Sequence, residues 1–163
     1  MAKNRIFLVA AIFLVLIIRV FAVEDDIKKI KSILNDDKPE VEKVVKKEGK
    51  KEIYYFLVNK GRPDMKYMIF SDAISTTKEG MNGKVPLIII ADKELKIIEV
   101  LIEKNSETAV QIERIKKNRY VSKVKESVNN RLEKIDAVAG ATYTSKAIFE
   151  GVKDSINKIK RIK

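Results

Sequence analysis

The residues best placed to do chemistry lie in one short stretch near the C-terminus, Asp136-Ala-Val-Ala-Gly-Ala-Thr-Tyr-Thr-Ser145. Gly140 and Ala141 carry almost no side chain, so the backbone can approach a bulky partner closely, and Gly140 can adopt a positive φ without steric cost. Apolar residues then recur at helical spacing, which predicts a helix that begins near Thr144 or Ser145. Unpaired amide groups and the positive end of the helix dipole favour a phosphate group at such a place.

The same stretch also fits a simpler interpretation, a turn that leads into a capped helix. Short strings of Gly, Ala and Thr are common, and hydroxyl side chains are preferred at helix N-caps. The two interpretations differ in what they expect of the rest of the chain. Context elsewhere in the chain is therefore needed to choose between them.

Five residues of this stretch resemble the signature at which FMN is esterified to a threonine in the FMN-binding domain family: Asp136, Gly140, Ala141, Thr142 and Thr144. That family includes the G subunit of Rnf complexes, the C subunit of sodium-pumping quinone reductases and small extracytoplasmic electron carriers. Ala139 departs from the pattern, because Ser or Thr is usual there. The resemblance implies that a flavin transferase binds FAD, joins FMN to the Thr144 hydroxyl through a phosphodiester and releases AMP.

The resemblance also suggests roles for the other residues of the motif. Asp136 is expected to orient the motif loop or to help the transferase and its metal recognise the site. Thr142 is expected to hydrogen bond to backbone or phosphate. Tyr143 either stacks near the flavin or only covers the surface beside it.

A second similar segment is Asn105-Ser-Glu-Thr108, which resembles an Asn-Glu-Thr-Pro segment close to the flavin in that family. By this match Glu107 and Thr108 are flavin neighbours. Thr108 with Gln111 also fits a helix capping box, which is a structural alternative for the threonine. The segment 79–84 stands where the family has a glycine-rich Gly-Tyr-Gly-Gly sequence, and Ala109 stands where it has Pro. The resemblance extends from about residue 52 to residue 158.

The N-terminus resembles an export signal. Lys3 and Arg5 precede thirteen apolar residues, 6–18, and then Arg19 and a possible cleavage site after Ala22. Thirteen helical residues span about 20 Å, whereas the hydrocarbon core of a bilayer is about 30 Å thick. The run is therefore a cleaved signal peptide, or it is a retained membrane anchor in which the Arg19 side chain reaches the headgroups. A buried core helix is the third alternative. Either of the first two places residues from about 24 onward outside the cytoplasm, in the periplasm or at the cell surface.

Composition excludes many kinds of chemistry. The 163 residues include no Cys and no His, so disulfides, cysteinyl clusters, histidine-based metal sites and catalytic triads are all excluded. A redox-active chain of this composition needs a cofactor that brings its own reactivity. The net charge of +11 falls to +8 once Lys3, Arg5 and Arg19 leave with a signal. The charges are mostly Lys spread among acids, which indicates a solvated surface with some attraction for anionic lipid or an acidic partner, and no nucleic acid.

The pattern of elements predicts an α+β fold, with an antiparallel sheet of four to five strands and helices on one side. Strands are expected at 52–58 and 65–70 and at 87–91 and 95–103, each pair forming a hairpin, with a loop at 71–83 and either a strand or a linker at 41–51. Helices are expected at 108–117, at 120–132 and at the C-terminus. The domains expected are a signal or anchor at 1–22, a charged helical or linker segment at 23–51 and an FMN-binding domain at 52–163.

The functional hypothesis is an extracytoplasmic electron-transfer flavoprotein with covalent FMN, more an electron carrier or redox-complex subunit than a stand-alone enzyme. Its expected partners are a flavin transferase and the redox proteins of a membrane electron-transfer chain. Two alternatives remain. One is a flavin-binding sensory or regulatory module of a membrane complex, and the other is a structural module of the same fold without flavin.

Overall fold

The computed structural model describes residues 24–36, 38–132 and 134–163. The chain divides into two compact units, Met1–Pro39 and Glu40–Lys163. In the first unit, residues 24–34 are helical. The expected export signal at 1–22 lies outside the described residues. Within the part of the chain that is described, no helix combines the length and the apolar character needed to cross a bilayer.

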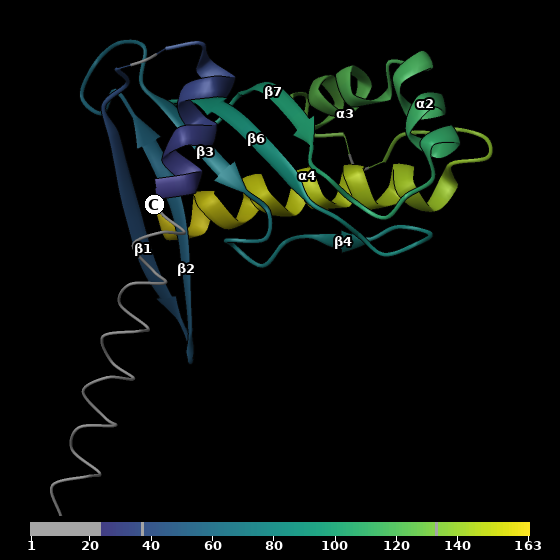
Figure 1. Ribbon diagram of the computed structural model, residues 1–163, viewed down its shortest axis with the longest axis horizontal. Helices are drawn as coiled ribbons and strands as arrows, with labels where there is room; N and C mark the ends of the chain where they lie inside the picture. The colour runs from purple at the N-terminus through teal and green to yellow at the C-terminus, as the bar shows by residue number, and fades with distance from the viewer. Residues whose placement is uncertain (1–23, 37, 133) are drawn as a thin grey trace, which may run out of the picture. The chain divides into compact units, whose positions relative to one another are not determined.

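The second unit is built on a five-stranded antiparallel sheet (Figure 1). Its strands, in the spatial order β1-β2-β3-β6-β7, are β1 Val41–Glu48, β2 Lys51–Val58, β3 Lys66–Phe70, β6 Leu87–Asp92 and β7 Ile97–Ile102. A separate two-stranded hairpin, β4 Lys78–Glu79 and β5 Lys84–Val85, interrupts the segment expected to be only loop. The predicted α+β class and antiparallel sheet are confirmed, as are both predicted hairpins.

Residues 41–48, for which the sequence allows a strand or a linker, form the edge strand β1. It pairs with β2 along its whole length, from Val41 opposite Val58 to Glu48 opposite Lys51. The sheet therefore begins at Val41, before the expected boundary at residue 52. An edge strand is only partly buried, and its charged side chains discourage pairing with other chains. The alternation of apolar residues that marks an inner strand is therefore missing, which is why the sequence is ambiguous here.

Three helices follow the sheet: α2 Ala109–Lys117, α3 Tyr120–Asn129 and α4 Thr142–Ile162. Figure 1 shows the long α4 running beside the sheet, with α2 and α3 gathered near the end where α4 begins. Apolar residues of the helices and of one sheet face form a common core that includes Leu57, Ile69, Leu87, Ile89, Ile115, Val124, Ile148, Val152 and Ile156.

The start of α4 differs from the prediction. The helix begins at Thr142, with Ala141 as its N-cap, rather than near Thr144 or Ser145. The prediction assumed that a hydroxyl residue would cap the helix. Instead the Ser145 hydroxyl lies inside the first turn, where it donates to the Ala141 carbonyl at 2.8 Å and accepts from the Val138 amide at 3.0 Å.

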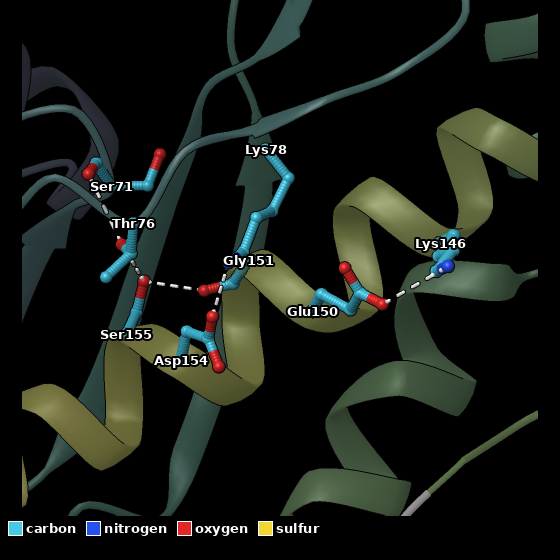
Figure 2. A network of polar contacts seen from close by, with 8 residues as sticks. All are labelled: Ser71, Thr76, Lys78, Lys146, Glu150, Gly151, Asp154 and Ser155. Atoms are coloured by element: carbon cyan, nitrogen blue, oxygen red, sulfur yellow. Dashed lines mark hydrogen bonds and ion pairs between the residues drawn. The ribbon is translucent and has the colours of Figure 1, made fainter.

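A buried polar network fixes the segment before β4 to the middle of α4 (Figure 2). The hydroxyls of Thr76 and Ser155 are hydrogen bonded at 2.6 Å, and Ser155 also donates to the Gly151 carbonyl at 2.7 Å. Next to them, the Lys78 ammonium pairs with the Asp154 carboxylate at 2.5 Å. The base of the β4–β5 hairpin is thus held on α4.

Ser155→Ala is expected to lower the free energy of unfolding by about 1–3 kcal/mol, because it removes a partner from the buried Thr76 hydroxyl. Denaturant unfolding followed by circular dichroism measures this loss. The matched control is Ser122→Ala on the exposed side of α3, which should stay within about 0.5 kcal/mol of the wild type. Equal losses in the two variants would show that the Thr76–Ser155 bond contributes nothing specific.

Candidate functional site

Thr144 lies in the first turn of α4 and is completely buried. Its hydroxyl donates a short hydrogen bond to Oε2 of Glu107. Glu107 belongs to the loop between β7 and α2 and is itself only 9% exposed. The two residues are 37 positions apart in the sequence. The fold therefore joins the two segments that the sequence singled out separately.

The second oxygen of the Glu107 carboxylate is held by a third segment. Its Oε1 accepts from the backbone amide of Asn82 at 2.7 Å, at the tip of the β4–β5 hairpin. The backbone amide of Glu107 in turn donates to Asn105 Oδ1 at 2.9 Å. The carboxylate is thus fixed at both oxygens, one toward the hairpin and one toward Thr144.

The hairpin approaches Glu107 so closely at Gly80 that any larger residue would have to displace a neighbouring side chain. A Cβ there would lie 2.6 Å from Glu107 Oε1 and 2.9 Å from Val85 Cγ2. Sequence reasoning treated segment 79–84 only as a departure from a glycine-rich pattern and did not include Gly80 or Asn82 among the site residues. The available signal was that the segment keeps two glycines, Gly80 and Gly83, three positions apart like the first and last glycines of Gly-Tyr-Gly-Gly.

Gly140 adopts φ +72°, a positive value that glycine takes without steric cost. Its carbonyl accepts from Arg114 Nη1 of α2 at 3.0 Å, and a Cβ at this position would lie 1.6 Å from that nitrogen. Sequence reasoning missed Arg114, because nothing in the sequence distinguishes it from the other 33 basic residues. Its guanidinium places a positive charge beside the turn that enters α4.

The start of α4 suits an anion. Within the described residues no side chain forms a capping hydrogen bond at this helix start, because the N-cap residue, Ala141, has only a methyl group. The first amide groups of a helix have no partner inside the helix, and with the helix dipole they bind phosphate. The uncapped turn, the small residues Gly140 and Ala141, and the Thr144 hydroxyl are therefore compatible with a phosphate ester at this place.

The remaining predicted site residues are exposed. Tyr143 is 63% exposed, and Asp136 and Thr142 are also on the surface. Thr108 is the N-cap of α2, where its side chain accepts from the Gln111 amide at 3.2 Å while the Gln111 side chain accepts from the Thr108 amide at 3.0 Å. The capping box that the sequence offered as an alternative role for Thr108 is confirmed.

Thr142 also lines a cavity of about 480 Å³, which is within the range of small-molecule sites. Its walls combine the apolar surfaces of Tyr120, Ile135 and Phe149 with charged side chains of both signs, which are Lys134, Lys146, Lys153, Glu150 and Asp154. Burial raises the pKa of Tyr120 to about 12. The cavity places apolar surface and side chains of both charges directly beside the motif.

The match to a known family spans this whole arrangement. Residues 80–157 match the family model of the FMN-binding domain. The chain carries a domain of that family. The matched range contains the hairpin tip, Glu107 and Thr144, so the three segments that meet in space all belong to the FMN-binding domain. The protein is thus a flavin-binding protein. No curated protein and no solved structure matches the chain.

Proposed function

We propose that this protein is an extracytoplasmic electron-transfer flavoprotein whose FMN is joined by a phosphodiester to Thr144 Oγ1. The observation that carries the proposal is the position of the Thr144 hydroxyl, in the first turn of an uncapped helix and within an FMN-binding domain. In the attachment reaction this hydroxyl would attack the FMN-side phosphorus of FAD on a flavin transferase, and AMP would leave.

Each neighbouring residue then has a task that its geometry supports. The amides at the start of α4 would bind the phosphodiester oxygens, and the lack of a side chain at Gly140 is what lets Arg114 approach the turn. Arg114 adds a positive charge beside the turn. The anion therefore meets donors and positive charge from two helices, which favour its retention against the negative charge of Glu107 beside Oγ1.

Attachment through the phosphate leaves the flavin ring chemically unmodified, so the bound cofactor supplies one- and two-electron transfer. The phosphodiester bond keeps the flavin on the protein. Outside the cytoplasm a dissociated flavin is lost by dilution, whereas a tethered one keeps a fixed effective concentration at its site. The N-terminal basic residues and apolar run support this location, although they lie outside the described residues.

Electron transfer is favoured over substrate turnover because the chain lacks the two residue types that most often serve enzymes as general base and as thiol nucleophile. It contains no His and no Cys, and the motif residues Asp136 and Tyr143 face solvent. A carrier needs only accessible flavin and a surface for brief docking with donor and acceptor proteins. These partners would belong to a membrane electron-transfer chain, with the N-terminal segment as a possible anchor.

The reduced, flavin-loaded protein is expected to be reoxidised rapidly by an acidic electron-accepting flavoprotein, with no organic substrate required. Its +8 charge should speed this encounter. Raising the ionic strength from about 0.01 M to about 0.15 M shortens the Debye length from about 30 Å to about 8 Å. The reoxidation should therefore become slower as salt is added. Stopped-flow absorbance of the flavin at several salt concentrations measures both properties.

A neutral small oxidant serves as the control, since its reaction should not depend on salt. Rapid and saturable oxidation of one metabolite by the isolated protein would instead identify an enzyme and contradict the carrier function.

A further inference from the structure

We propose that Glu107 is the proton acceptor for the Thr144 hydroxyl during flavin attachment. This inference rests on the proposed function, because it assigns the base for the reaction that joins FMN to Thr144. It places part of the catalytic chemistry on the acceptor domain, in addition to whatever the transferase supplies.

The contact between the two residues is the first argument. A hydroxyl is a weak nucleophile until an adjacent base takes its proton, and the base must lie within hydrogen-bond reach. Thr144 Oγ1 already donates to Glu107 Oε2. The proton therefore points at the carboxylate before the transferase arrives, and the oxygen lone pairs are left for the phosphorus.

The second argument is that the carboxylate is held in place. Asn82 fixes Oε1 through its amide, and Gly80 leaves the space that this oxygen occupies. An anion that is largely withdrawn from solvent needs such donors to be tolerated. A side chain that merely filled space here would not need to be a carboxylate, since an apolar residue would avoid the cost of burying charge.

The step balances without an oxidant or reductant. The Thr144 Oγ1–H bond breaks and its proton passes to Glu107 Oε2, while Oγ1 forms a bond to the FMN-side phosphorus of FAD. The bond from that phosphorus to the bridging oxygen breaks, and AMP leaves with this oxygen. Glu107 then returns the proton to the departing phosphate or to water. The carboxylate is regenerated.

The neighbouring hydroxyl shows why Thr144, and not Ser145, is suited to this reaction. Ser145 Oγ donates to the Ala141 carbonyl and accepts from the Val138 amide, so it is committed to backbone that forms the turn. No carboxylate contacts it within the described residues. Of the two adjacent buried hydroxyl groups, it is that of Thr144 that is hydrogen bonded to a carboxylate able to act as a base.

The test is the rate of covalent flavin incorporation into purified Glu107→Gln, with FAD and a purified transferase, followed by intact mass. Glutamine keeps the size and a hydrogen-bond acceptor but is not a base. At saturating acceptor domain the rate is expected to fall by roughly 100-fold or more, the ordinary contribution of a general base, with little change in KM. The matched control, Glu113→Gln, changes an exposed carboxylate on α2 and should react at the wild-type rate.

Glu107→Ala supplies an independent test, because formate added to the reaction can occupy the space of the missing carboxylate. Formate is expected to accelerate attachment to Glu107→Ala and to leave the wild type unaffected, and a purely structural role predicts no such rescue. Thermal unfolding of each variant confirms that it is folded. Wild-type rates in Glu107→Gln, or no effect of formate on Glu107→Ala, would overturn the assignment of the base. Failure of the wild type itself to take up flavin would instead contradict the proposed function.

Discussion

Thr144→Val is expected to give a folded protein that carries no covalent flavin after coexpression with a flavin transferase. Valine has the shape of threonine without the hydroxyl, so the core around the first turn of α4 keeps its packing. The Glu107 carboxylate loses one of its two hydrogen-bond donors, which is expected to lower the free energy of unfolding by about 1–3 kcal/mol without unfolding the protein. Flavin fluorescence of the denatured protein band in a gel measures the attachment directly.

Thr144→Ser is the matched control, since it restores a hydroxyl at the same place and should be modified. It loses a buried methyl group, so slower attachment than in the wild type is expected. A fluorescent Thr144→Val band would show that another residue accepts the flavin. A dark wild-type band under the same conditions would show that this domain binds FMN without a covalent bond or is not a substrate of that transferase.

Much of the fold follows from local patterns in the sequence. The inner strands are continuous apolar and β-branched runs, such as Leu87–Asp92, and the turns between them are rich in Gly, Pro, Asn and Asp. The capping box of α2 fixes that helix start to within one residue. These features are local, so they can be recognised without knowing how the chain folds.

The parts that could not be predicted depend on contacts between distant segments. Glu107 was selected by resemblance, but its bond to Thr144 arises only when the β7–α2 loop is placed against α4. Gly80 and Asn82 become site residues because the Thr76–Ser155 network fixes their hairpin on the same helix. Arg114 likewise contacts Gly140 only through the packing of α2. The spacing of these residues along the sequence does not determine the distances between them in the folded protein.

The complete burial of Thr144 leads to the second large prediction. In the proposed attachment, a flavin transferase would have to bring the phosphorus of FAD to Oγ1, which no solvent reaches in this structure. Some element must therefore move before attachment. The tip of the β4–β5 hairpin is the best candidate, because each of its strands has only two residues and it rests on Glu107 through the Asn82 amide. Its base is anchored to α4, so the tip can lift while the rest of the domain stays in place. Glu107 then gives up the Asn82 amide but stays positioned by the bond from its own amide to Asn105 and by the Thr144 hydroxyl.

A disulfide between positions 83 and 106 offers a way to lock this tip. A Cβ built at Gly83 lies 3.8 Å from the Ser106 Cβ, which is about the mean separation of the Cβ atoms in a disulfide. The chain has no cysteine of its own, so Gly83→Cys with Ser106→Cys gives a single possible bridge. Gly83 has φ +138°, and a cysteine there adds some backbone strain that the reduced form shares.

The oxidised double variant is expected to resist flavin attachment, and the same sample should become fully modifiable after reduction. The comparison is internal, because both forms carry the same substitutions and differ only in the bridge that ties the hairpin to the loop holding Glu107. Incorporation is followed by intact mass with FAD and purified transferase, and Gly83→Cys alone controls for the effect of the oxidant. Equal rates in the oxidised and reduced double variant would mean that Thr144 is reached by another route, such as fraying of the first turn of α4, in which Ala141 provides no side-chain cap to hold the helix start.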